Sequence, residues 1–217
     1  MKSTAFIEAM AFELSVPQKT MVTYTRFLKE AGLLTTGARG VNAPHMTPLD
    51  AARVTIALLV SDTPGQAVER VKRFGGIRYS PAFRKTIRGY KTIQPSEFEE
   101  LFEGETLEEV LTFLYAMPEK MGVDAALEWN HHNVYHLRAH PFDVLVELFS
   151  DVWEDGEIVG ERVIPFKGKK YQENTPKGEF PKPVSEWTFI KGGIRVERMI
   201  TGMSFLSIGM LLAGVGD

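Results

Sequence analysis

The chain of 217 residues is 44% hydrophobic and 24% charged, which is typical of a globular protein with a sizeable core. It contains no cysteine, and this excludes disulfides, thiolate metal sites and a cysteine nucleophile. The sequence has neither a secretory signal pattern nor an apolar run near the ~18 residues of a membrane span. We therefore expect a cytoplasmic location and no membrane contact.

The net charge of −3 averages two parts of opposite sign. Residues 1–91 contain 14 Lys and Arg against 6 Asp and Glu, a balance of +8, whereas residues 92–217 contain 11 against 22, a balance of −11. This division favours a nucleic-acid-binding part joined to a part with another task. The alternative is that the basic part docks on the acidic part of its own chain or of a neighbour.

Two short helices are predicted at the N-terminus. The first begins with a cap on Ser3 or Thr4 and continues to about Glu13. The second has Pro17 at its first position and ends before Gly32, where a positive φ is favourable. Apolar residues at helical spacing predict the buried faces, which comprise Phe6, Ile7, Met10 and Ala11 in the first helix and Met21, Tyr24, Leu28 and Ala31 in the second, with Phe27 at its edge.

The opposite face of the second helix is polar and basic. Gln and Arg make bidentate contacts with base edges, while Lys and Thr hold phosphates. In the loop that follows, Arg39 lies between Gly37 and Gly40, so its guanidinium can reach a phosphate or a minor groove. The alternatives are an ordinary core helix and a solvated loop. The predicted DNA-binding residues are Gln18, Lys19, Thr20, Thr23, Arg26, Lys29 and Arg39.

Two helices joined by a short turn form the helix-turn-helix pattern. The run Thr20-Met21, Tyr24, Arg26, Leu28, Ala31-Gly32-Leu33-Leu34 resembles the second helix and exit of winged helix-turn-helix and MerR-type DNA-binding domains, of the kind found in phage and mobile-element proteins. The resemblance covers roughly residues 1–45. It implies a homo-oligomeric, non-enzymatic protein that binds double-stranded DNA and regulates transcription in a phage or mobile element. A phage small terminase subunit, which recognises packaging DNA, is the alternative.

Two further helices are predicted in the basic part. Thr47, Pro48 and Asp50 begin a helix that is apolar around most of its circumference and should be central and buried, with Arg53 at its edge. A second helix runs from Thr63-Pro64 to Gly75-Gly76. From Arg70 to Lys91 cations alternate with aromatic residues, which favours a phosphate-facing surface over stacking on single-stranded nucleic acid.

The composition becomes acidic after Gln94-Pro95, which predicts a DNA-binding domain at residues 1–93 and an acidic α+β domain at residues 94–217. Acidic amphipathic helices follow, broken at Gly104 and ended at Met117-Pro118, with a third over Asp124 to Trp129. We expect this part to serve oligomerisation or contact with a protein partner.

The C-terminal residues change to a period of two. One hairpin is predicted over residues 144–166 with a tight turn at Asp155-Gly156, and a second over residues 187–200 around Gly192-Gly193. A surface loop joins them at residues 167–183, and a short apolar helix at residues 203–212 packs on the sheet or on another subunit. The sequence thus predicts an α+β protein, in which an N-terminal helix-turn-helix domain, with or without a wing, precedes an α+β domain with antiparallel hairpins.

Histidines between His131 and His140 offer a function of another class, a metal-binding enzyme or sensor. If residues 128–140 were one helix, Glu128, His132, His136 and His140 would share a face and could bind zinc or nickel. The helix is disfavoured by Asn130 and Asn133, and a strand with Val134, His136 and Arg138 on one face is an equal alternative. The chain also lacks a Gly-rich phosphate loop and a nucleophile elbow. We therefore expect no metal and no cofactor.

Overall fold

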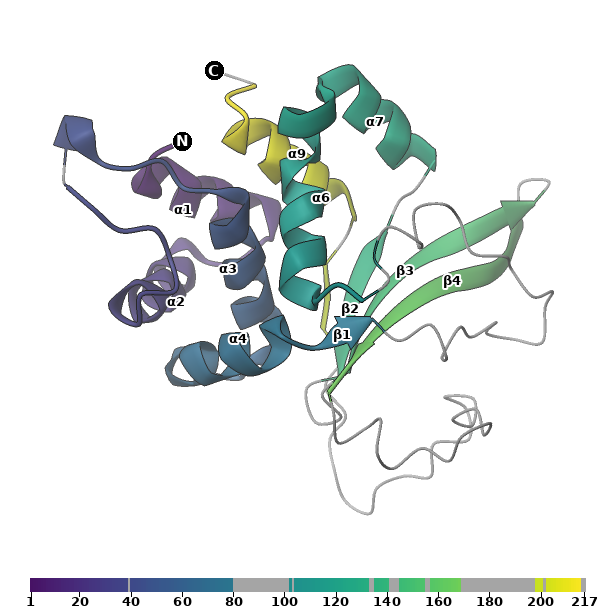
Figure 1. Ribbon diagram of the computed structural model, residues 1–217, viewed down its shortest axis with the longest axis horizontal. Helices are drawn as coiled ribbons and strands as arrows, with labels where there is room; N and C mark the ends of the chain where they lie inside the picture. The colour runs from purple at the N-terminus through teal and green to yellow at the C-terminus, as the bar shows by residue number, and fades with distance from the viewer. Residues whose placement is uncertain are drawn as a thin grey trace, which may run out of the picture.

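The computed structural model describes residues 1–38, 40–79, 102, 104–132, 135–140, 145–154, 157–168, 198–200 and 202–215. The chain forms a group of helices packed beside an antiparallel sheet (Figure 1). The elements, in order, are α1 (Ser3–Glu13), α2 (Gln18–Glu30), the 3-10 turn η1 (Gly40–Asn42), α3 (Pro48–Val60), the 3-10 turn η2 (Pro64–Gln66), α4 (Ala67–Gly75), β1 (Arg78–Tyr79), α6 (Leu107–Met121), α7 (Val123–His132), β2 (His136–His140), β3 (Leu145–Glu154), β4 (Glu157–Lys167), β5 (Arg198–Ile200) and α9 (Gly202–Leu212).

The sheet has the strand order β1-β4-β3-β2-β5, and each of these pairings is antiparallel. The prediction of a mixed α+β protein with an antiparallel hairpin is confirmed. Strands β3 and β4 form that hairpin, with Glu154 opposite Glu157 and a register shift at Val152/Trp153. Of the second predicted hairpin, the described residues contain only β5, which pairs with β2. The loop at residues 169–183 and the turn at Gly192-Gly193 lie outside the described residues.

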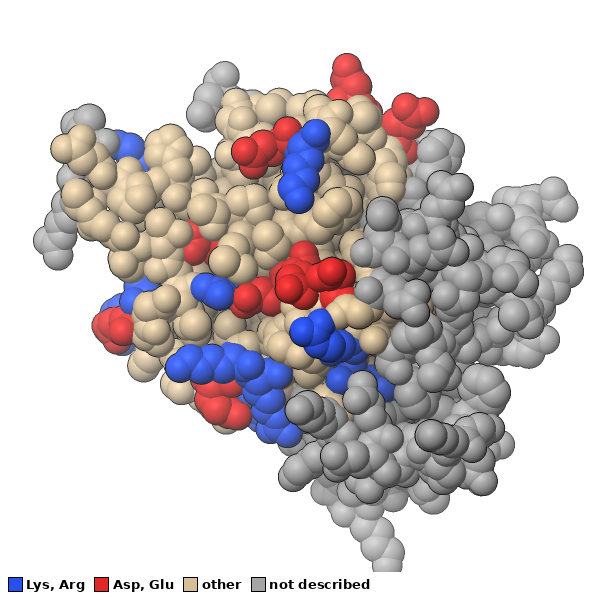
Figure 2. Space-filling model, in the orientation of Figure 1, with Lys and Arg blue, Asp and Glu red and all other residues tan. Residues whose placement is uncertain are grey.

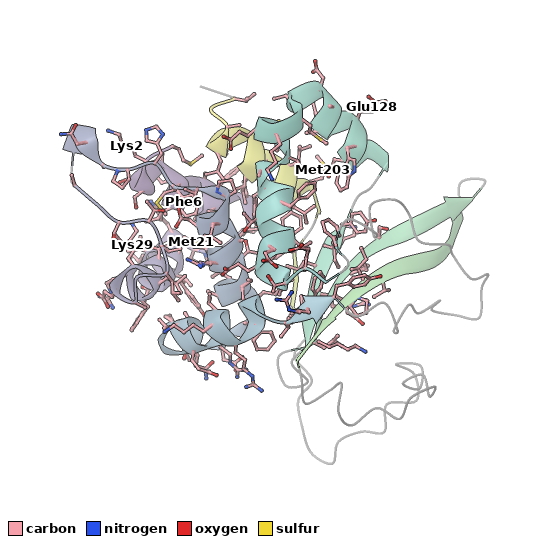
Figure 3. All side chains as sticks on the ribbon, in the orientation of Figure 1. Lys2, Phe6, Met21, Lys29, Glu128 and Met203 are labelled. Carbon is pink, nitrogen blue, oxygen red and sulfur yellow. The ribbon has the colours of Figure 1, made fainter. Side chains whose placement is uncertain are left out.

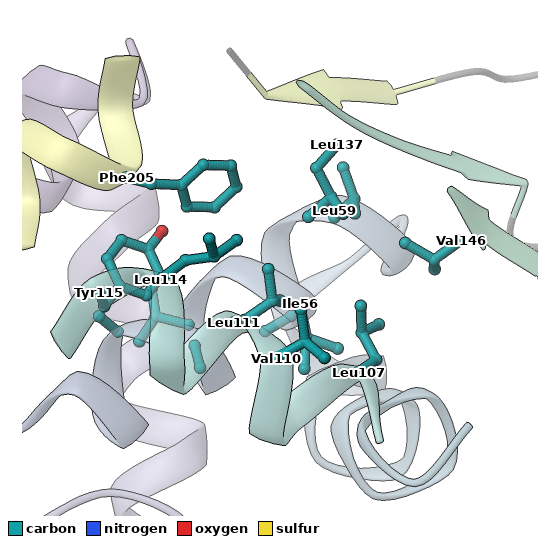
Figure 4. Packing of buried hydrophobic residues seen from close by; sticks show 14 of the residues in the cluster. Ile56, Leu59, Leu107, Val110, Leu111, Leu114, Tyr115, Leu137, Val146 and Phe205 are labelled. Atoms are coloured by element: carbon teal, nitrogen blue, oxygen red, sulfur yellow. The ribbon is translucent and has the colours of Figure 1, made fainter. Parts of the chain in front are cut away.

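Helix α3 lies at the centre of the helical group, as its sequence predicted. Thr47 and Asp50 form a capping box, and Pro48 occupies the first turn. The helix is buried around most of its circumference and packs against α2, α4, α6 and the β2 and β5 strands. Ile56 and Leu59 contact the side chains of α6 and the sheet in one continuous hydrophobic core, shown in Figure 4.

This core draws on both sides of the predicted boundary at residues 93/94. It extends from Phe6 in α1 to Ile208 in α9. The hydroxyls of Thr55 on α3 and Tyr115 on α6 form a buried hydrogen bond of 2.6 Å, and burial raises the pKa of Tyr115. The boundary itself lies outside the described residues. The basic and acidic parts therefore share one core rather than folding around separate ones.

Several predicted helix boundaries are wrong by one or more residues. The N-cap of α1 is Lys2, so Ser3 and Thr4 lie inside the helix, and Pro17 is the N-cap of α2 rather than its first residue. The prediction that α6 ends at Met117-Pro118 is also wrong, because Pro118 lies inside the helix. Tertiary packing explains the continuation, since α9 lies so close that a Cβ atom on Gly209 would be 3.0 Å from Cδ of Pro118.

The C-terminal helices were predicted with mixed success. A third acidic helix is confirmed as α7, which extends beyond Trp129 to His132. Helix α9 packs mainly against α6, α1 and α7 rather than on the sheet, and its predicted packing on another subunit stays a prediction. The hydroxyl of Ser204 on α9 donates to the carbonyl of Glu13 on α1 at 3.1 Å. No helix in the described part of the chain has the length and apolar character to cross a bilayer.

Candidate nucleic-acid interface

Helices α1 and α2 pack against each other across a connection at residues 14–17. The connection turns at Ser15, whose φ is 52°, and the amide of Val16 donates to the carbonyl of Ala11 at 2.9 Å. Predicted core residues Met21 and Leu28 are fully buried and Tyr24 is 5% exposed. Ala31 is exposed and is therefore a wrong core prediction, whereas Thr25, which the sequence analysis missed, is buried. This anchoring leaves the opposite side of α2 on the surface.

We name the outward side of α2 the α2 face, formed by Gln18, Lys19, Val22, Thr23 and Arg26. Gln18, Lys19, Val22 and Arg26 are exposed and Thr23 is half-buried. The hydroxyl of Thr23 donates to the carbonyl of Lys19 at 2.9 Å, so its oxygen stays available as an acceptor. Thr20, also predicted as a DNA contact, is half-buried in the first turn. The surface thus offers a cation, an amide and a guanidinium within about three turns.

Arg26 contacts two neighbours on its own helix, Glu30 and Phe27. Its Nε lies 3.8 Å from a carboxylate oxygen of Glu30, and the two side chains are 62% and 64% exposed. Its guanidinium also lies 5.3 Å from the ring centroid of Phe27. An exposed ion pair of this kind contributes little stability, so a phosphate or a guanine can replace Glu30 as the partner of Arg26 at little cost.

Two predicted site residues differ from this group. The ammonium of Lys29 donates to the hydroxyl of Ser3, which ties α2 to the first turn of α1 (Figure 3). Lys29 is accordingly half-buried rather than fully exposed. Arg39 lies outside the described residues. The structure therefore brings Gln18, Lys19, Thr23 and Arg26 together, and it directs Lys29 toward α1.

The loop after α2 is clamped on both sides of residue 39. The buried carboxylate of Asp50 accepts from the amide of Thr35 at 2.7 Å, and from the amide and hydroxyl of Thr47 at 2.7 and 2.9 Å. The ammonium of Lys2 donates to the carbonyl of Gly40 at 3.1 Å. These bonds fix the two ends of the predicted arm to α3 and to the N-terminus.

A second group of cations lies on α4, which packs against α2. Lys72 and Arg73 are exposed, and neither forms an ion pair with a residue in the described part of the chain. Figure 2 shows basic side chains along the lower edge over α4 and at the left edge over α2. Arg70 is half-buried, its guanidinium 5.9 Å from the ring centroid of Phe74, and the described residues supply no hydrogen-bond partner for its buried Nε. Tyr79 is buried, so it cannot stack on a base.

Other cations of the basic part contact the acidic part of the same chain. The guanidinium of Arg53 pairs with Glu108 at 2.8 Å, and this hydrogen bond raises the pKa of Arg53 above its ordinary value. Arg78 donates to the carbonyl of Gly104. These contacts agree with the alternative interpretation of the charge division, in which basic residues pair with the acidic part of the same chain. They account for Arg53 and Arg78, while Lys19 and Arg26 on α2 and Lys72 and Arg73 on α4 are exposed.

Comparison of the chain with protein-family models, curated proteins and solved structures found no match. The function of the surface is therefore inferred from its own geometry and charge. Val22 also lies on this surface and was not among the predicted site residues, although a helical wheel places it one turn from both Gln18 and Arg26.

The histidines do not share one helix, so the one-helix alternative for a metal site does not apply. Glu128 and His132 belong to α7, whereas His136 and His140 belong to β2. The ring of His136 lies 5.3 Å from that of Phe149, in agreement with the strand alternative. Within the residues that the structure describes, no three potential ligands are close enough to hold a metal ion.

Proposed function

We propose that the protein binds double-stranded DNA sequence-specifically, with α2 in the major groove. The observation that carries the proposal is the composition of the α2 face, where exposed Gln18, Lys19 and Arg26 stand opposite a fully buried stripe. A helix is about 10–12 Å in diameter and the major groove about 12 Å wide, so α2 fits the groove. Gln18 and Arg26 would contact base edges, and Lys19 and Thr23 the phosphates beside them.

The cations of α4 extend this surface. Because α4 packs against α2, Lys72 and Arg73 would lie near the phosphates that flank the groove. The clamp of Asp50 on Thr35 and Thr47 would hold the described ends of the loop after α2 against α3, beside the surface that meets the DNA. These contacts supply affinity without sequence preference, while the α2 face supplies the preference.

A single helix buries too little surface for useful specificity at physiological salt, so we propose that the protein acts as a homo-oligomer. Its proposed role is transcriptional regulation in a phage or mobile element. Mass photometry distinguishes this role from DNA packaging, because a dimer is expected for a regulator. A ring of eight or more subunits would contradict the regulatory role.

Selection of bound duplexes from a random pool at fixed salt tests the proposal directly. The purified full chain should enrich a common motif after several rounds. A pool that stays random, with binding equal for all duplexes, would show that the protein does not read sequence. If heparin, another polyanion, binds as tightly as duplex DNA, the surface binds anions in general rather than DNA.

A further inference from the structure

Val22 is the large apolar side chain of α2 that stays on the surface, with 47% of its area exposed. It lies one helical turn from Gln18 on one side and from Arg26 on the other, with Cβ atoms about 5–6 Å apart in this geometry. Its neighbours on the α2 face are therefore the side chains that suit base edges. The core of the protein makes little use of it, since the buried side of α2 is formed by Met21, Tyr24, Thr25 and Leu28.

Local helix stability does not favour a valine at this place. A β-branched residue loses χ1 freedom in a helix, so Lys, Gln or Glu would stabilise an exposed position better. The same restriction gives Val22 one strongly preferred rotamer, which presents its two methyl groups in a fixed direction. The side chain of Val22 is thus a rigid apolar group in the middle of a polar, basic face. Such a face is complementary to a ligand that presents one apolar group surrounded by polar ones.

The major groove contains such a group in the C5 methyl of thymine. We propose that Val22 is a specificity-determining residue that contacts a thymine methyl, beside the bases that Gln18 and Arg26 contact. This inference rests on the proposed function, because it requires α2 to enter the major groove. It adds the chemical identity of one base in the target.

The helix geometry also limits where that thymine lies. Val22 and Arg26 are four residues apart, a rise of about 6 Å, and base pairs follow one another at about 3.4 Å. The thymine should therefore lie about two base pairs from the position whose identity depends on Arg26.

The test uses the full chain and the motif obtained by selection. Each thymine of that motif is replaced in turn by deoxyuridine, which removes only the C5 methyl, and affinity is measured for the wild type and for Val22→Ala. We expect one thymine per half-site at which the replacement weakens wild-type binding about fourfold, the effect of one buried methyl group. The same replacement should leave the affinity of Val22→Ala unchanged.

Met121→Ala is the matched control, because Met121 is similarly exposed, at 42%, and lies at the end of α6 away from α2. This variant should respond to deoxyuridine as the wild type does. Circular dichroism should show intact helices in both variants, since alanine favours a helix. If every replacement weakens the wild type and Val22→Ala equally, or none weakens the wild type, the inference is wrong while the proposed function stands. If no motif is selected, the proposed function itself fails.

Discussion

The guanidinium of Arg53 on α3 donates to both carboxylate oxygens of Glu108 on α6, at 2.8 and 3.1 Å. A third bond, of 2.8 Å, reaches the carbonyl of Leu33, just after α2. One side chain of the basic part thus joins the end of α2 to the acidic part. The pair has side chains only 23% and 26% exposed, so solvent screens it less than it screens the Arg26–Glu30 pair.

Removal of either partner should therefore destabilise the fold. We expect Arg53→Met and Glu108→Gln each to lower the free energy of unfolding by about 1–2 kcal/mol. The first variant leaves the partly buried carboxylate without its partner, and the second removes the negative charge and one of the two oxygens that accept from Arg53. The double variant should lose less than the sum of the two. Urea unfolding of the four proteins measures the coupling, and strictly additive losses would show that the two side chains do not interact in solution.

Specific DNA binding should depend on the guanidinium of Arg26. Arg26→Ala is expected to weaken binding of the selected motif by about 1–3 kcal/mol and to relax preference at one base position. Arg26→Lys should recover binding to unrelated duplexes but not this preference, since an ammonium lacks the bidentate geometry. Lys120→Ala, which removes one charge from α6, is the control. Unchanged gel-shift affinity of Arg26→Ala would exclude α2 as the reading helix.

The α4 cations should act through phosphates. For the Lys72→Ala/Arg73→Ala double variant, we expect affinity to fall equally for the selected motif and for unrelated duplexes. The slope of log affinity against log salt should decrease by about one for each residue. Fluorescence anisotropy over a range of salt concentrations measures both quantities. A wild-type slope in the double variant would place α4 away from the DNA.

The first turn of α6 predicts a pH dependence at acid pH. Hydrogen bonds from the amide and hydroxyl of Thr106 lower the pKa of Glu109 below its ordinary value, and the contact with Glu109 raises the pKa of Glu105. The pKa of Glu109 is lower in the folded than in the unfolded chain. Its contribution to the free energy of unfolding is therefore complete when the pH is above the unfolded pKa, near 4.5, and is lost as the pH falls through the folded pKa. Thr106→Ala should return the pKa of Glu109 toward its ordinary value in an NMR titration. An unchanged titration would contradict the capping box.

Features that depend on neighbours in the chain could be read from the sequence. The capping box of Thr47 and Asp50 needs residues three apart, and the β3–β4 hairpin needs a short turn between alternating strands. The buried stripe of Met21, Tyr24 and Leu28 follows from helical periodicity alone. In each case the interacting groups are only a few residues apart, or the period itself defines the buried face.

Features that depend on distant partners were decided by the tertiary structure. Lys29 is directed to Ser3 and Arg53 to Glu108 because the helices meet, and no local pattern encodes those meetings. The continuation of α6 through Pro118 likewise depends on the close packing of α9 against α6. The sequence by itself thus determined a polar, basic face on α2, whereas the packing of α1, α3 and α4 decided which of its side chains remain free to contact a ligand.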